Sequence, residues 1–165
     1  MKYNFKVSLK ENDLYSFMMY HNYAGAQGKL GILVAILAFA AAAVTWGTVE
    51  IFYSIVYIGC GIIFLIYTPL SLKLKTKRQF AMVPAIKEEM NYELNDEKII
   101  SSMQDQKAEV RWIDVFKVVG RKDYIYIYTD RLHASIIPKA AMGDQLDDIL
   151  EFITLKTPKG KVKIK

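Results

Sequence analysis

Residues 30–72 form a stretch of 43 residues that carries a single charge, Glu50, in a chain of 165 residues. A continuous helix of that length would measure about 65 Å, at a rise of 1.5 Å per residue. This is about twice the roughly 30 Å hydrocarbon core of a bilayer, so the stretch must break. Gly47 offers turn freedom, and Trp46 and Glu50 suit the membrane interface and water. We therefore predict an α-helical membrane hairpin over residues 28–72, with spans at about 28–46 and 49–72.

The charges beside the hairpin predict its orientation. Its loop lacks Lys and Arg, whereas Lys29 lies at the start of the first span and four basic residues follow the second one closely: Lys73, Lys75, Lys77 and Arg78. Basic residues favour the cytoplasmic side of the membrane, so we expect a multi-pass protein of the cell membrane with both termini in the cytoplasm. A cleaved signal peptide is the alternative, since the Ala40–Ala43 run resembles a cleavage site.

The net charge of +5 invites a nucleic-acid function, but the basic residues cluster beside the hairpin and at the C-terminus. We expect a basic linker at residues 73–88, an unstructured basic tail at 157–165 and no nucleic-acid partner. Basic residues near a bilayer attract anionic headgroups. The predicted membrane-surface contacts are Lys73, Lys75, Lys77, Arg78, Lys161, Lys163 and Lys165.

Small residues recur in both predicted spans, at Gly31, Ala35, Ala38, Ala42, Gly59 and Gly61. Small faces let helices approach closely, so we interpret them as packing within the hairpin. A homo-oligomer through the transmembrane helices is the alternative. Apart from Lys29 and Glu50 at their starts, neither span contains an Asp, Glu, Lys, Arg or His, which argues against a channel, a proton relay or a transporter.

The remaining segments alternate apolar and polar residues, the pattern of strands. We expect residues 1–27 to hold a strand at Lys2–Leu9 and a short interfacial helix capped by Asn12 or Asp13. Residues 89–156 should form a cytoplasmic domain of six strands and a final helix capped by Asp144. The expected strands are Met90–Asn95, Lys98–Gln104, Lys107–Ile113, Asp114–Val119, Tyr124–Thr129 and Leu132–Ile137. In Tyr124–Tyr128, either the isoleucines or the tyrosines face the core.

Three segments, Trp112–Val118, Tyr124–Tyr128 and Ile136–Lys139, resemble the bacterial YcxB-like family in order and spacing. That resemblance implies an N-terminal strand, two membrane spans and a C-terminal domain similar to pleckstrin-homology barrels. Such a barrel has seven antiparallel strands and a C-terminal capping helix. Six strands follow the spans, so Lys2–Leu9 would supply the first, and the hairpin would be an insertion after it. The implied fold is a membrane hairpin plus an α+β domain.

Residues with catalytic or metal-binding spacing are missing. The chain has no phosphate loop, no His-Glu-x-x-His and no Cys-x-x-Cys, and its single cysteine, Cys60, lies in the second predicted span. His133 has no obvious acid partner in its predicted strand. We expect no catalytic residue, no metal and no cofactor.

Two features leave alternatives open. Trp112 is expected in the barrel core, with ligand stacking as the alternative. Five basic residues are expected in solvated turns, with a phosphate or headgroup patch as the alternative: Arg111, Lys117, Arg121, Lys122 and Arg131. The sequence thus predicts a non-enzymatic membrane protein that presents a pleckstrin-homology-like binding module, with a protein partner rather than a lipid. The alternative function is immunity against a membrane-targeted toxin or bacteriocin.

Overall fold

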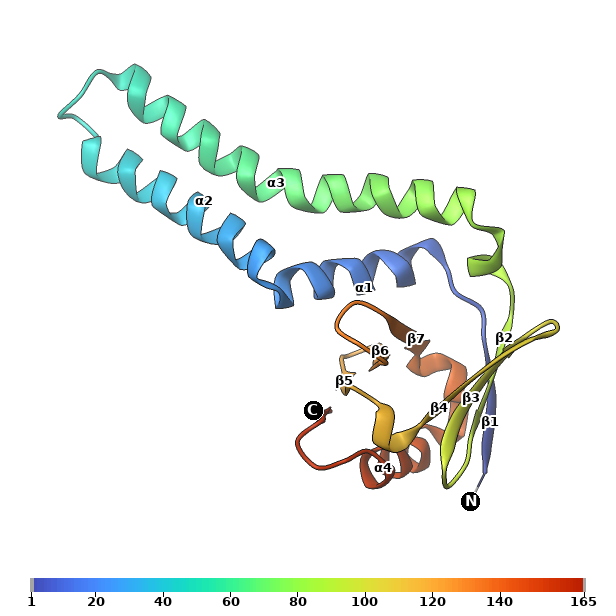
Figure 1. Cartoon of the computed structure of the whole chain (residues 1–165). Helices are drawn as coiled ribbons and strands as arrows, with labels where there is room; N and C mark the ends of the chain where they lie inside the picture. The colour runs from blue at the N-terminus through green and yellow to red at the C-terminus, as the bar shows by residue number, and fades with distance from the viewer. Residues whose placement is uncertain (1, 165) are drawn as a thin grey trace. The chain divides into compact units, whose positions relative to one another are not determined.

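The computed structural model describes residues 2–164, and the chain divides into two compact units. One unit joins the N-terminal residues through Asp13 with the residues from Val83 onward, and the other comprises Leu14–Met82. Figure 1 shows the course of the chain through both. The strand that precedes the helices therefore belongs to the same unit as the strands that follow them.

Three helices form the unit of residues 14–82: α1 (Glu11–Ala24), α2 (Ala26–Thr45) and α3 (Ile51–Met82). The predicted hairpin turn is confirmed between α2 and α3, where Gly47 has a φ of 79° that favours glycine. At its start, α1 is stabilised by Asp13, whose carboxylate accepts a hydrogen bond from the Lys10 N–H at 2.8 Å. This is the reciprocal half of a capping box.

The second predicted span continues as a helix ten residues beyond its expected end. The basic segment from residue 73 was predicted as a linker, but it is helical through Met82. Lysine, arginine, leucine and glutamine are good helix formers, so nothing local stops the helix before Pro84. Pro84 then opens a short 3₁₀ turn, η1 (Pro84–Lys87).

Small residues bring α2 and α3 together, as predicted. Ala35 and Ala42 are buried on α2. A Cβ added at Gly61 of α3 would lie 2.7 Å from the Phe39 ring, so a larger residue there would have to displace that ring. A Cβ at Gly31 or Gly59 would meet nothing within 4 Å, so these two glycines take no part in packing the hairpin.

In the other unit, β1 (Tyr3–Val7) forms the edge of a four-stranded antiparallel sheet, sheet A. Its partners follow in order: β2 (Met90–Leu94), β3 (Lys98–Met103) and β4 (Gln106–Arg111). The pairing of β1 with β2 confirms that the first strand comes from before the two long helices. In this pairing Phe5 lies opposite Tyr92, and their rings stack at 5.6 Å.

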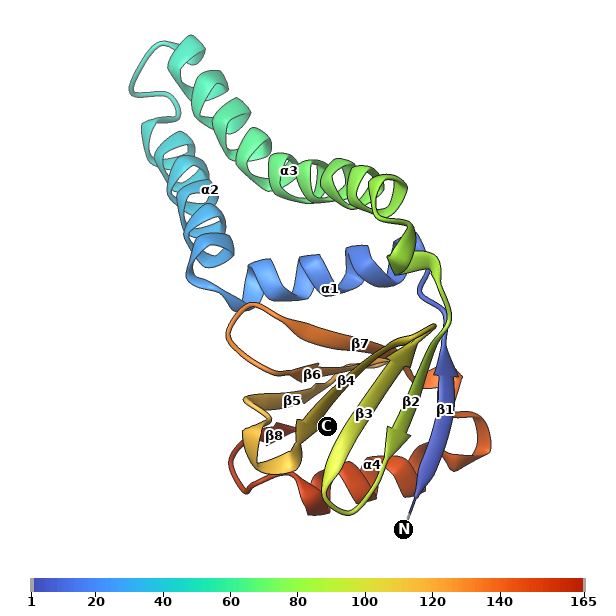
Figure 2. The ribbon, with the colours of Figure 1, turned by 45° about the vertical axis from the view of Figure 1, so that its right-hand side comes forward.

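The strands β5 (Lys117–Gly120), β6 (Tyr124–Tyr128), β7 (Ala134–Pro138) and β8 (Val162–Lys163) form a separate sheet B, in the order β7-β6-β5-β8. The two sheets do not close into a barrel, so the predicted closed barrel is wrong. A 3₁₀ turn, η2 (Trp112–Asp114), separates β4 from β5 and shortens both of the strands predicted there. Figure 2 shows sheets A and B as separate layers.

The basic tail is also more ordered than predicted. Its residues Val162–Lys163 form β8, which pairs in parallel with β5. The Nζ of Lys161 donates to the backbone oxygens of Ile113 and Val115, at 3.1 and 2.8 Å. The expected unstructured tail is therefore wrong through residue 164.

The final helix, α4 (Leu146–Lys156), begins after a 3₁₀ segment, η3 (Lys139–Gln145). Its N-cap residue is Gln145 rather than the predicted Asp144. Lys156 at its other end forms an ion pair of 2.6 Å with Asp96 in the β2–β3 turn, which lowers the pKa of that carboxyl to about 2. Helix α4 thus lies at the end of the two sheets where β2 turns into β3 (Figure 2).

The core of this unit fills the space between the two sheets and α4. Both core isoleucines of β6, Ile125 and Ile127, face this space. Tyr126 and Tyr128 alternate with them and are also buried, so β6 is covered on both faces. Trp112 packs in the core, with its ring edge toward Phe152 and its Nε1–H donating to the Asn95 oxygen at 2.8 Å.

Candidate functional site

A groove of about 330 Å³ opens between the sheets at the end opposite α4. We call it the seam groove, because it lies where the barrel fails to close. Sheet A and η1 contribute most of its wall, and the edge strand β7 contributes the remainder. The lining residues are Val7, Leu9, Ala85, Ile86, Glu88, Met90, Tyr92, Ser101, Met103, Ala134, Ser135 and Ile136.

The β7 side of the seam groove is a sheet edge with unpaired backbone groups. The Thr129 N–H donates to the His133 oxygen at 3.1 Å, so these residues form a hydrogen-bonded pair of the β6–β7 ladder. Hydrogen-bonded and non-hydrogen-bonded pairs alternate in antiparallel sheets. Ser135 and Ile137 of β7 therefore turn their backbone N–H and C=O groups toward β6. The N–H and C=O groups of Ala134 and Ile136 point to the free edge.

Two polar side chains from different sheets lie at the groove. Tyr92 of β2 is buried, and this burial raises the pKa of its phenol, while the Ser135 side chain of β7 opposes the rise. Both residues line the seam groove, so each sheet contributes a hydroxyl group to its wall.

Among the residues that the structure describes, Glu88 is the one carboxylate that lines the seam groove. Glu88 is half-buried, and among residues 2–164 its carboxylate forms no ion pair. Its neighbour Glu89, by contrast, is exposed and pairs with Lys6 at 2.6 Å. A partly buried, unpaired carboxylate favours a cation as its partner.

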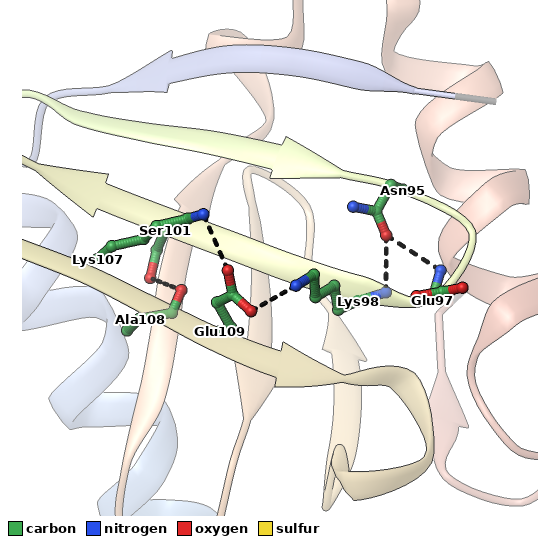
Figure 3. Close-up of polar contacts among 7 residues, drawn as sticks. All are labelled: Asn95, Glu97, Lys98, Ser101, Lys107, Ala108 and Glu109. Atoms are coloured by element: carbon green, nitrogen blue, oxygen red, sulfur yellow. Dashed lines mark hydrogen bonds and ion pairs between the residues drawn. The ribbon is translucent and has the colours of Figure 1, made fainter.

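A larger hollow of about 800 Å³ lies between sheet A and η3, but the charged side chains that line it are already paired. Lys6, Glu93 and Lys107 line it, and each forms an ion pair elsewhere on the sheet. Figure 3 shows the β3–β4 part, where Glu109 contacts both Lys98 and Lys107. Exposed pairs of this kind contribute little energy and leave no free charge for a ligand.

The four predicted membrane-contact residues after the second span are all exposed on the last turns of α3: Lys73, Lys75, Lys77 and Arg78. Between them, Thr76 is buried and its hydroxyl contacts the Met18 sulfur of α1 at 3.1 Å. Residues 51–72 of α3 span about 33 Å, close to one bilayer core, before these charges begin.

The predicted contacts of the tail differ from one another. The Lys161 ammonium group donates hydrogen bonds to two backbone oxygens, and it could bind a headgroup only if these bonds broke. Lys163 lies exposed in β8. Lys165 lies outside the described residues.

The five basic residues weighed as a phosphate patch do not gather in one place. Lys117 begins β5, while Arg121 and Lys122 follow its other end. Arg111 pairs with Asp114 at 2.7 Å, and the Lys117 ammonium lies 4.2 Å from the Tyr128 ring centroid. These basic side chains therefore lie at opposite ends of β5 or contact neighbouring residues, and they do not form one patch.

His133 has an acid partner that the sequence analysis missed. Its Nδ1 lies 2.7 Å from Asp130 Oδ2 in the β6–β7 turn, which replaces the first two residues of the predicted strand. The N–H groups of His133 and Leu132 also bond to Asp130, and together with the His133 ring they lower the pKa of that carboxyl to about 2. Both side chains are more than half exposed, so this arrangement orders a turn.

Among residues 2–164, no group of three or more His, Cys, Asp or Glu side chains is placed to hold a metal ion. Helices α2 and α3 are each long and apolar enough to cross a membrane. Few of their side chains are buried, and large apolar ones such as Leu37, Phe52 and Ile63 are exposed. A soluble protein seldom exposes so much apolar surface.

The chain therefore combines two helices that could span a membrane with a two-sheet α+β domain whose first strand precedes them. Residues 94–155, from the end of β2 into α4, match the family model described as YcxB-like protein. This match, over 62 of the 165 residues, confirms the resemblance to the YcxB-like family seen in the sequence. Neither a curated protein nor a solved structure matches the chain.

Proposed function

We propose that this chain is a non-enzymatic membrane protein that holds a pleckstrin-homology-like binding module at the cytoplasmic face for a protein partner. The observation that carries the proposal is the pairing of β1 with β2 around the two long helices. Two chain connections, rather than one linker, then tether the module to the hairpin. A doubly tethered domain has little freedom to leave the membrane surface.

The order of the elements supports a pleckstrin-homology-like module. Four strands form sheet A, the next three belong to sheet B, and a helix follows at one end of the core. The resemblance implies the same succession of seven strands and a capping helix. The additional strand β8 and the open seam are departures from that pattern.

The distribution of charge supports the cytoplasmic orientation. Lys29 lies in the first turn of α2, and four further basic residues lie in the last turns of α3. Both positions are at the end of the α2–α3 hairpin away from the Trp46–Glu50 turn, which has no basic residue. Anionic headgroups of the cytoplasmic leaflet would attract this end.

Site-specific photo-crosslinking in native membranes tests the proposal. A photoreactive amino acid at Met103 in the seam groove, or at the exposed Leu155 on α4, should crosslink a protein. The same group at Thr48 in the hairpin turn is the matched control and should not trap that protein. Crosslinks to lipid alone at every position would refute a protein-binding module.

Immunity against a membrane-targeted toxin is the alternative function. Deletion of the gene would then sensitise cells to the toxin, and the protein crosslinked at Met103 or Leu155 would be that toxin. Unchanged sensitivity, together with a crosslinked cellular protein, would favour the general binding module.

A further inference from the structure

We propose that the seam groove binds an extended peptide segment of the partner, which adds as a strand to the free edge of β7 and places a basic side chain at Glu88. This inference rests on the proposed function, since it assigns the site and the chemistry of the protein partner. It follows from three observations: a free sheet edge, a groove beside it and an unpaired carboxylate in that groove.

The free edge of β7 selects a polypeptide backbone as its ligand. Ala134 and Ile136 each offer one N–H and one C=O, two residues apart along the strand. By the alternation described above they do not bond to β6, and among residues 2–164 they form no other backbone hydrogen bond. A second strand carries donors and acceptors at the same repeat of about 6.6–6.8 Å for two residues. Lipid acyl chains offer neither group.

The edges formed by β4 and β8 are less suited to strand addition. On β4, the Trp112 N–H donates to the Glu97 oxygen, so by alternation Lys107 and Glu109 turn their backbone groups outward. Both residues carry charged side chains that are paired with each other, a device that discourages strand addition. Strand β8 has only two residues. The β7 edge, by contrast, lines the seam groove, as does Val7 at the end of β1, the remaining edge strand.

The lining of the groove predicts the side chains of the bound segment. Met90, Met103 and Ile86 provide flexible apolar contacts, so we expect apolar residues on the face that enters the groove. Glu88 favours lysine or arginine at one position, because the residue is half-buried and its carboxylate is unpaired. The ligand is therefore an apolar, extended segment with one basic residue.

The test uses the purified full chain in detergent and a phage-displayed library of random heptapeptides as the probe. The enriched peptides should share apolar residues and one lysine or arginine. Binding of a synthetic enriched peptide is then measured by calorimetry. Bound peptide should also slow hydrogen exchange in residues 134–138.

Two pairs of matched variants locate the binding site. Ala134→Pro removes one outward N–H of β7 without affecting its bonds to β6, and should weaken binding about three- to tenfold. Its control, Lys107→Pro, does the same at the β4 edge and should leave binding unchanged. Glu88→Gln should weaken binding about tenfold, whereas Glu89→Gln should not. Thermal unfolding of each variant shows that it remains folded.

Three results would overturn the inference. They are a failure to enrich any peptide, binding that is insensitive to Ala134→Pro and Glu88→Gln, and a dimer of the chain that Ala134→Pro dissociates. The last would assign the β7 edge to a second copy. A protein crosslinked at Leu155 alongside any of these results would leave the proposed function standing and refute only the peptide site.

Discussion

Phe5→Ala should strongly destabilise the unit that contains sheets A and B and α4, although Phe5 precedes the other core strands by more than eighty residues in the sequence. Its side chain is 8% exposed, stacks on Tyr92 and belongs to the core shared by both sheets. An aromatic side chain buries about 150–250 Å², which at about 25 cal/mol per Å² corresponds to roughly 4–6 kcal/mol. Because unfolded chains already bury part of that area, we expect a loss of about 3–4 kcal/mol.

The assay is chemical unfolding of the full chain in detergent, followed by the fluorescence of Trp112. Trp112 packs in the same core, and replacing Trp46 by Phe leaves it as the only tryptophan. The matched control is Lys6→Ala, the next residue along β1, whose exposed ion pair with Glu89 should contribute no more than about 1 kcal/mol. If Phe5→Ala cost no more than Lys6→Ala, β1 would not be part of this core.

Three further predictions address the hairpin and the turns. In a cysteine-free background, a cysteine at Thr48 should react with an impermeant maleimide in intact cells and one at Lys122 should not; the reverse pattern would invert the topology. Gly61→Leu should lower the thermal stability of the detergent-solubilised protein, because even a Cβ there overlaps the facing phenylalanine ring, whereas Gly59→Leu, in open space, should be neutral. The Asp130 carboxyl should titrate near pH 2 by NMR, since two backbone N–H groups and a histidine ring lower its pKa to about 2. Its contribution to stability is present above about pH 4 and lost as the pH falls toward 2, so a midpoint near 4 would contradict this account.

Local patterns in the sequence predicted most elements, because period and composition determine them. The alternation in residues 2–9 predicted β1, and the uncharged stretch predicted the two long helices with their turn at Gly47. The end of α3 was misplaced because its basic residues were interpreted as a linker, although lysine and arginine propagate helices well.

Features that depend on distant partners could not be predicted in this way. Strand β8 exists because the Val162 segment finds β5, and no local pattern marks a parallel pairing of two residues. The seam groove brings together Glu88, Ser101 and Ser135, which lie on three separate elements of the chain. Whether two sheets close depends on the geometry of every strand, and therefore not on any single motif.

The unit that contains sheets A and B is interrupted in the sequence by α1, α2 and α3, which lie between β1 and β2. This interruption has a consequence for the order in which the chain folds during synthesis. Strand β1 leaves the ribosome first, but its partner β2 follows only after 82 further residues. Closing a flexible loop of that length would cost about 4 kcal/mol in entropy. A helical hairpin that folds first replaces most of that loop with an ordered segment, and so reduces the cost. Insertion of the hairpin would then precede assembly of the domain, and a defect such as Gly61→Leu would delay folding of strands it does not contact.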